Sequence, residues 1–276
     1  MKRLIVTADD FGMAPEVNEA VILAHTRGVL TAASLMVSGE AAVQAVELAR
    51  KHPTLRVGLH LVLVQGRPVL PRERIPGLVG RDGRFSDAVA WSGARYFLTP
   101  GIRRQLEAEC AAQLERFLSF GLPLDHINAH THLHIHPTIL DIVIALARRG
   151  GAVPVRLPRQ PLRSLPFGQA AMAAVMAPWV ALTRARLRRA GLRFNDETFG
   201  LFETGAMTEE AWLRAIPRLG EGVTEIYAHP ATATRGELAR NMPRYRHAEE
   251  LAALLSPRVR AALDAAGVER VGFCDL

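Results

Sequence analysis

Short β-branched or apolar runs alternate with longer amphipathic stretches along almost all of the 276 residues. This alternation is typical of βα units, in which helices cover a sheet of parallel strands. The strands are predicted at 3–8, 31–37, 56–63, 123–130, 153–157, 223–228 and 270–275. The predicted helices between them lie at 15–27, 40–52, 105–120, 138–149, 209–219 and 248–266.

These elements favour one α/β domain over residues 1–276, a single distorted TIM-like (βα) barrel with about seven parallel strands. Hydrophobic residues make up 49% of the chain and charged residues 22%, so the chain can bury a full core. Two stretches, near 66–100 and 158–205, interrupt the alternation. We predict that both are insertions beside a functional site.

Acids and histidines fall at the ends of the predicted strands. Asp9 and Asp10 end the first strand, and His60 lies towards the end of the third. His130 ends the fourth strand, and His229 follows the sixth. The carboxyl ends of parallel barrel strands meet on one face, where the active sites of such barrels form. These side chains are therefore expected to gather there despite their separation in sequence.

Five of the ten histidines lie between Asp125 and Pro137. They are His126, His130, His132, His134 and His136. On a continuous strand they would share one face, since their numbers are all even. A catalytic zinc-like site takes three protein ligands and a water molecule, so they cannot all bind one ion. The others are expected to bind substrate, to orient a ligand or to begin the next helix.

Adjacent carboxylates suit metal-assisted hydrolysis, because one can bind a cation while its neighbour accepts a proton from water. Taken alone, Asp9 and Asp10 are more typical of a turn or a helix cap, and His60 alone is more typical of a core histidine. Their occurrence together with other histidines at several strand ends favours a metal site.

Other polar residues carry weaker signals. Arg156 and Arg159 follow the fifth predicted strand. Arg156 is a candidate substrate-binding residue, and a surface position is almost equally open for both. His25, His52 and His247 have no comparable neighbours and are predicted at helix ends or on the surface.

The formal net charge of +7 comes from one segment. Between Arg156 and Arg193 there are eight arginines and no acids or lysines, which leaves −1 for the rest of the chain. No nucleic-acid-binding motif accompanies them, so we expect no nucleic-acid partner. The apolar run before Asp9 is too short for a secretion signal, which predicts a cytoplasmic protein. Cys110 and Cys274 are predicted to be buried thiols.

Four motifs resemble those of the YdjC-like carbohydrate deacetylases, in the same order and over nearly the whole chain. They are Thr7-Ala-Asp-Asp-Phe-Gly12, Val57-Gly-Leu-His-Leu61, His130-Thr-His-Leu-His134 and Ala228-His-Pro230. The resemblance implies a (βα) barrel that removes the N-acetyl group from an amino sugar, with a divalent metal bound by Asp10, His60 and His130. By analogy with NodB-type deacetylases, Asp9 would be the general base. Members that act on chitooligosaccharides carry histidine in place of Thr131, so their sugar preference does not transfer directly.

Three further stretches are similar to the hopanoid biosynthesis-associated branch of that family (HpnK). They are Ala14-Pro-Glu-Val-Asn-Glu-Ala20, Gly28-Val-Leu-Thr-Ala-Ala-Ser-Leu-Met36 and Gly66-Arg-Pro-Val-Leu-Pro71. The branch resemblance implies an N-acetylglucosaminyl hopanoid as substrate, deacetylated to the glucosaminyl form.

A nearly uncharged run at 168–182 precedes arginines at 184, 186, 188 and 189. It is interrupted by Pro178 and too short to span a bilayer. An apolar helix with Trp179 and a basic end suits the surface of a membrane that contains anionic lipids. A core helix that covers the barrel explains the pattern equally well. We expect either a peripheral contact through 168–189, at the inner membrane surface, or packing against the barrel.

The predicted mechanism uses a divalent metal ion, Mg or Zn, to activate the acetyl carbonyl and a water molecule. Asp9 accepts a proton from the water. His229, or as a second choice His132, protonates the leaving amine, and His132 is also a candidate substrate-binding residue. Histidine ligands suit Zn, Mn, Co or Ni better than Mg, although family members are associated with magnesium.

Other functions stay open at this point. One is a deacetylase of soluble chitooligosaccharides. A phosphodiester hydrolase is less favoured, because two-metal sites need more bridging carboxylates than the sequence offers. A non-catalytic metal-binding protein would bind several ions per chain. The sequence does not decide the oligomeric state, and a homodimer is one option.

Overall fold

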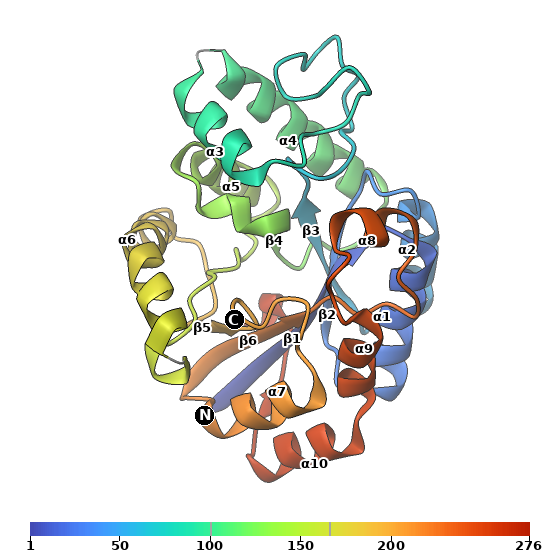
Figure 1. Cartoon of the computed structure of the whole chain (residues 1–276), viewed down its shortest axis with the longest axis vertical. Helices are drawn as coiled ribbons and strands as arrows, with labels where there is room; N and C mark the ends of the chain where they lie inside the picture. The colour runs from blue at the N-terminus through green and yellow to red at the C-terminus, as the bar shows by residue number, and fades with distance from the viewer. Residues whose placement is uncertain (100, 166) are drawn as a thin grey trace.

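The computed structural model describes residues 1–99, 101–165 and 167–276 (Figure 1). Within them, one curled 7-stranded sheet has the order β4-β3-β2-β1-β6-β5, and β7 also pairs with β1. All of these pairings are parallel. The strands are β1 (Lys2–Phe11), β2 (Ala32–Leu35), β3 (Arg56–Leu61), β4 (Ile127–Ala129), β5 (Glu197–Phe199), β6 (Gly222–Ala228) and β7 (Glu269–Arg270).

The sheet is a half-barrel that does not close. Between its edge strands β4 and β5 lies the segment 153–157, which the sequence predicts as a strand. This segment forms only an isolated bridge, between Val155 and Ile127. Pro154 and Pro158 flank Val155 and lack the N–H groups that a ladder needs. The predicted α/β class with parallel strands is therefore confirmed, whereas a complete barrel is not formed, and β5 lies in a stretch predicted to be an insertion.

Helices pack outside the sheet, and three of them, α3, α6 and α8, lie around the carboxyl ends of its strands (Figure 1). The helices are α1 (Pro15–Arg27), α2 (Ala42–Lys51), α3 (Val89–Leu98), α4 (Ile102–Ser119), α5 (Pro137–Arg149), α6 (Phe167–Arg189), α7 (Glu209–Ala215), α8 (Gly236–Asn241), α9 (His247–Leu255) and α10 (Pro257–Ala265). The helix predicted at 248–266 is two helices. Ser256 separates them, and its Oγ accepts from the backbone N of Arg258 at 3.1 Å. The sequence pattern does not predict α3 or α8.

The interior of the curl is layered. Residues 4, 6 and 8 of β1 belong to the main core, whereas Ile5 packs in a separate small cluster with Phe273. Thr7 and Asp9 share the face of Ile5, because side chains alternate along a strand. Thr7 Oγ1 donates to Glu225 Oε1 at 2.8 Å. Buried polar groups, among them Thr7 and Glu225, therefore lie next to the apolar cluster that contains Ile5.

Pro100 and Pro166 fall in the two predicted insertions and lie outside the described residues. None of the described helices has the length and apolar composition needed to cross a membrane. Cys110 is buried, as predicted. Cys274 is exposed, so that part of the prediction is wrong; it lies in the short turn Phe273–Asp275 near the end of the chain.

Candidate metal centre and active-site cavity

Asp10, His60 and His130 meet at the carboxyl ends of β1, β3 and β4. Their side chains are buried, and one possible ligand atom from each lies within 4.8 Å of the others. His60 Nε2 lies 3.3 Å from Asp10 Oδ1, and His130 Nδ1 lies 3.1 Å from the same oxygen. Asp10 Oδ2, His60 Nε2 and His130 Nε2 are buried without a hydrogen-bond partner. The structure thus brings together the three residues predicted as metal ligands.

This donor set fits a divalent cation. Ligand atoms about 2.1 Å from one tetrahedral ion lie roughly 3.4 Å apart, which is close to the separations around Asp10 Oδ1. Asp10 Oδ2 and His60 Nε2 are buried without partners, which is costly, and a cation beside them would satisfy them. One carboxylate and two imidazoles suit zinc and several other metals, so the set does not select one ion.

A backbone irregularity lets two neighbouring aspartates serve one site. Neighbours on a regular strand point to opposite faces. Here the register between β1 and β2 shifts between Ala8 and Phe11, and Asp10 has a φ of 65°, in the left-handed region. Bulges of this kind re-aim side chains beside functional sites. Asp10 consequently reaches the two histidines while Asp9 lines the cavity beside them.

The histidine run does not form one continuous face. β4 ends at Ala129, and a 3₁₀ segment follows in which Thr131 and His132 have φ values of 54° and 55°. Of the five histidines in the run, His130 joins Asp10. The other four have different partners. His126 Nδ1 contacts Asp125 Oδ2, and His132 Nε2 contacts Tyr227 Oη. His134 Nε2 contacts the Arg156 carbonyl, and His136 packs edge-on against Phe97.

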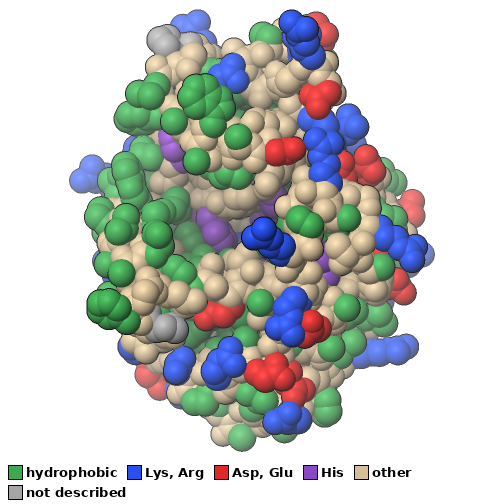
Figure 2. Space-filling model, in the orientation of Figure 1, with side chains coloured by type: hydrophobic (Ala, Val, Ile, Leu, Met, Phe, Trp, Pro, Cys, Tyr) green, Lys and Arg blue, Asp and Glu red, His purple; other side chains and the backbone are tan. Residues whose placement is uncertain are grey.

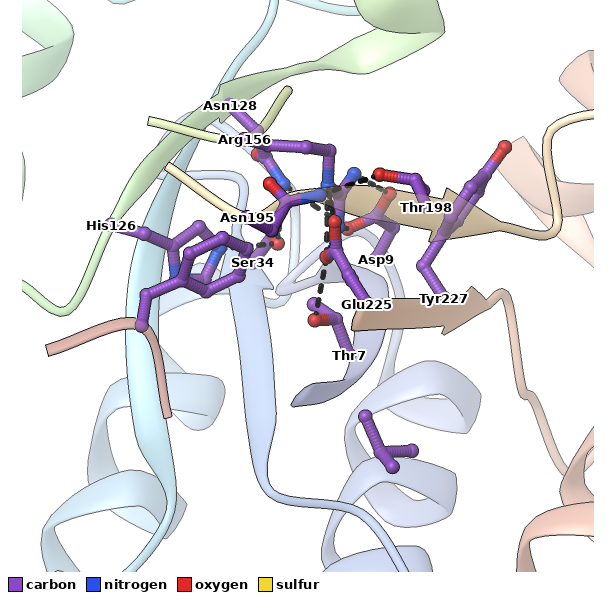
Figure 3. Close-up of polar contacts among 12 residues, drawn as sticks. Thr7, Asp9, Ser34, His126, Asn128, Arg156, Asn195, Thr198, Glu225 and Tyr227 are labelled. Carbon is purple, nitrogen blue, oxygen red and sulfur yellow. Dashed lines mark hydrogen bonds and ion pairs between the residues drawn. The ribbon is translucent and has the colours of Figure 1, made fainter. Parts of the chain in front are cut away.

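A buried ion network lies beside the candidate metal centre (Figure 3). Arg156 Nη1 donates to Asp9 Oδ2 at 2.6 Å, and Nη2 donates to Asp9 Oδ1 at 2.9 Å. Arg156 Nε also donates to both carboxylate oxygens of Glu225 at 2.9 Å. Arg156 is 0% exposed. A direct contact between Arg156 and substrate, which the sequence suggests, would require it to leave these two carboxylates.

The charges of this layer suit a cation. Burial would raise the pKa of Asp9, but the charge and hydrogen bonds of Arg156 outweigh it and hold that pKa well below its usual range. Burial would likewise raise the pKa of Asp10, and His130 and His60 hold it low. Asp9 and Glu225 share one guanidinium, and Asp10 adds a further carboxylate beside His60 and His130, so the acids of this layer outnumber its arginine. A divalent cation would neutralise them.

A cavity of about 400 Å³ opens at the metal centre, and His229 lines it with Asp9, His60 and His130. The Nδ1 atom of His229 is buried without a partner. The backbone of His229 makes two side-chain contacts. Its N donates to Glu250 Oε2 at 2.5 Å, and its carbonyl O lies 2.6 Å from His247 Nδ1. Burial lowers the pKa of His229 to about 4, so its ring is neutral near pH 7.

Several residues around the site escape the sequence analysis. Glu225 could have been found as a charged residue within an apolar strand, and Asn128 lies inside the histidine-rich run. Glu250 lies in helix α9 and carries no visible signal. His247, predicted at a helix end or on the surface, does begin α9 but is buried, because its ring contacts the carbonyl of His229.

A curled, open parallel sheet with a buried carboxylate and two imidazoles at the carboxyl ends of its strands defines an α/β half-barrel protein with a candidate mononuclear metal centre. A family model described as YdjC-like protein matches residues 3–265. The chain belongs to the YdjC-like family.

Relatives that match over nearly the full length of the chain agree with the family assignment. A carbohydrate deacetylase of Geobacillus stearothermophilus is 35% identical over 271 residues, which is 98% of this chain and 96% of that protein. A carbohydrate deacetylase of Brevibacillus brevis is 32% identical over 275 residues, or 99% of each chain. The crystal structure of a candidate cellobiose-phosphate cleavage protein of Enterococcus faecalis has a TM-score of 0.79 and 29% identity, over 99% of this chain and 97% of that one. The family predicted from the motifs is confirmed, and the hopanoid branch stays a prediction.

Proposed function

We propose that this chain is a metal-dependent deacetylase that removes the N-acetyl group from an amino sugar. The observation that carries the proposal is the convergence of Asp10, His60 and His130 beside Asp9 in a cavity of about 400 Å³. A cavity of this size lies in the usual range for small-molecule sites. The full-length similarity to two carbohydrate deacetylases supports the same chemistry.

Each residue of the site has a proposed role. A divalent ion bound there would supply positive charge that polarises the acetyl carbonyl and makes water more acidic. Asp9, kept ionised by Arg156, accepts a proton from water. His229 is neutral near pH 7, so it must take up a proton during the reaction before passing it to the leaving amine. His132 is the second candidate for this role, and its Nδ1 also lacks a partner.

We further propose a lipid-linked substrate, an N-acetylglucosaminyl hopanoid, in line with the branch resemblance. A second cavity of about 550 Å³ adjoins the first and shares Val89, Thr131 and His132 with it. Its walls include Phe97 of α3 and Trp179 of α6, which are 64% and 46% exposed. Figure 2 shows histidines inside a hollow with hydrophobic side chains gathered on one rim. An apolar group attached to the sugar would fit along this groove.

Helix α6 supports a membrane contact for residues 168–189. Its only buried residues are Thr183 and Leu187, so most of its apolar part is exposed. The exposed large apolar side chains of α6 are Phe167, Met172, Val175, Met176, Trp179 and Leu182. Arginines follow, and one of them, Arg186, pairs with Asp141. An exposed apolar surface beside arginines suits an anionic membrane, and the cytoplasmic location stays a prediction.

The test is acetate release from an N-acetylglucosaminyl hopanoid and from chitobiose by the metal-reconstituted protein. We expect release by wild type and by the control His52→Ala, and none by His130→Ala. Release from chitobiose alone would remove the hopanoid assignment, and release from neither would contradict the deacetylase. Full activity of Asp9→Asn with metal bound would exclude Asp9 as the base. Unchanged binding to anionic liposomes after replacing the four arginines at 184–189 with glutamine would exclude the basic membrane contact.

A non-catalytic metal-binding protein is distinguished by stoichiometry. The described residues contain one group of acids and histidines placed to bind an ion. We therefore expect one ion per chain, whereas a storage protein would bind several.

A further inference from the structure

His229, the proposed proton donor, lies one residue beyond the paired part of strand β6. The last residue pair between β1 and β6 is Ala8 and Ala228, so the ladder between these strands ends just before His229. Pro230 follows and has no N–H group with which to continue it. The backbone N–H and carbonyl groups of His229 therefore need partners from outside the sheet.

Helix α9 supplies both partners. Glu250 Oε2 accepts from the backbone N of His229 at 2.5 Å, and His247 Nδ1 lies 2.6 Å from the His229 carbonyl oxygen. A carbonyl oxygen can only accept, so His247 is the donor. Glu250 is 0% exposed and His247 is 1% exposed, so water does not compete for these two bonds. Helix α9 therefore fixes the backbone of His229 both before and after its side chain.

Glu250 also holds a second segment beside the cavity. Its other oxygen, Oε1, accepts from the backbone N of Met207 at 2.8 Å. The loop that contains Met207 approaches the start of α9 closely, since a Cβ atom at Gly205 would lie 2.4 Å from the Tyr245 ring. Tyr245 in turn lines the cavity. One buried carboxylate thus joins the end of β6 to the loop that precedes α7.

Two tyrosines border the ring of His229. Its centroid lies 5.5 Å from that of Tyr227 and 5.1 Å from that of Tyr245, and all three residues line the cavity at the metal centre. The Nδ1 atom of His229 has no hydrogen-bond partner among the described residues, so it is available to a substrate. A displacement of about 1 Å in a reacting group can lower a rate about 100-fold, so the position of this ring matters for catalysis.

We propose that Glu250 and His247 are positioning residues that hold His229 where it can pass a proton to the leaving amine. The inference rests on the proposed role of His229 in a deacetylase. Both residues act through the backbone of His229, and neither is among the residues that line the cavity. Their loss should therefore lower kcat and leave KM and metal affinity almost unchanged.

The first test compares Glu250→Met with Glu109→Met in the metal-reconstituted full chain. Glu109 is the matched control, because it is also 0% exposed in a helix and accepts from two backbone N–H groups, those of Val69 and Leu70, at 2.8 and 2.9 Å. Each substitution removes a buried acceptor from two N–H groups, but only that of Glu250 reaches His229.

The assay is acetate release from whichever of the two substrates named above wild type deacetylates. Burial raises the pKa of Glu250 to about 7, so the assay is run at about pH 8.5, where this carboxylate is ionised in wild type. We expect Glu250→Met to lower kcat about 10–100-fold, with KM and Zn²⁺ affinity within about threefold of wild type. Glu109→Met should leave all three quantities unchanged.

The contact from His247 gives a second test, which can be made even if Glu250→Met does not fold. His247→Asn keeps an amide nitrogen near the position of Nδ1 and can still donate to the His229 carbonyl, whereas His247→Leu cannot. We expect His247→Leu to lower kcat about 10-fold without a change in KM, and His247→Asn to keep a kcat close to that of wild type.

The outcomes are distinct. An unchanged kcat in Glu250→Met and His247→Leu, an equal loss in Glu109→Met, or equal kcat values for His247→Asn and His247→Leu would overturn the positioning role while leaving the deacetylase intact. Loss of Zn²⁺ binding in Glu250→Met would also overturn it, because the residue would then support the metal centre. Failure of wild type to release acetate from either substrate would overturn the proposed function and this inference together.

Discussion

Replacing Arg156 with methionine tests whether the buried ion network stabilises the fold and holds the proposed base. The substitution leaves Asp9 and Glu225 without the guanidinium that donates to them at distances from 2.6 to 2.9 Å. Removing one partner of a buried ion pair typically costs about 3–5 kcal/mol. Because the net stability of a protein is only about 5–15 kcal/mol, we expect a large loss of stability at neutral pH.

The loss of stability in Arg156→Met should depend on pH, because the substitution changes the pKa of Asp9. In wild type the pKa of Asp9 is below its unfolded value, so Asp9 contributes stability that is present above the unfolded pKa and is lost as the pH falls. Without Arg156, only the charges of His60 and His229 still oppose burial, and we expect burial to raise the pKa of Asp9 above its unfolded value. The associated stability is then present at low pH and lost as the pH rises. The difference in free energy of unfolding between wild type and Arg156→Met should therefore shrink on acidification.

Urea denaturation across a pH series measures this difference. Arg163→Met is the matched control, since Arg163 also donates to both oxygens of one carboxylate, that of Glu197, at 2.8 and 2.7 Å. The Arg163 side chain is 54% exposed, and exposed ion pairs contribute only about 0–1 kcal/mol. The reasoning is refuted if Arg156→Met lies within about 1 kcal/mol of wild type near pH 8, or if its deficit does not change with pH.

Three further predictions concern packing, protonation and metal. Gly58→Ala should lower the free energy of unfolding, measured in urea, by about 2–4 kcal/mol, because its Cβ would lie 2.4 Å from the His126 ring. Gly93→Ala is the control and should not lower it, since nothing lies near its Cβ. Equal stabilities of the two variants would contradict the packing argument. Burial lowers the pKa of His134 from 6.5 to about 3, so the free energy of unfolding falls as the pH drops between these values. His134→Gln should reduce this dependence on pH. An unchanged dependence would contradict the role of His134. Chelation should lower the Tm of metal-loaded wild type, since an ion at 100 times its Kd contributes about 2.7 kcal/mol, but calorimetry should show no such change for His130→Ala.

Local patterns predict the regular elements well where their ends carry clear signals. Helix α1 has the predicted bounds, with Pro15 at its first position and Gly28 after its end, which are the residues that such ends favour. The apolar run around Val155 has the composition of a strand, but the neighbouring prolines limit its pairing to one bridge, so the predicted strand is not formed. Strand β5, with 3 residues, is too short to show a period.

The candidate ligands were visible for a related reason. Asp10, His60 and His130 each lie at the end of a strand with a strong apolar signal, and the topology of parallel sheets brings such ends together. The network around Arg156 was not visible, because its partners lie 147 and 69 residues away and depend on side-chain orientation inside the curl. Local sequence also gave no sign that the backbone would turn at His132 and separate the histidines.

The opening of the half-barrel between β4 and β5 separates the proposed metal ligands from the segment 158–205. The proposed ligands lie on β1, on β3 and directly after β4, all on the continuously paired part of the sheet. The segment 158–205 begins at this opening and contributes α6 to the apolar groove, but it carries none of these ligands. Because regular pairing is reduced there to the bridge between Val155 and Ile127, changes in the part of this segment that forms α6 need not shift β1, β3 or β4. Substitutions in α6 can therefore change the walls of the apolar groove while the proposed metal ligands keep their positions.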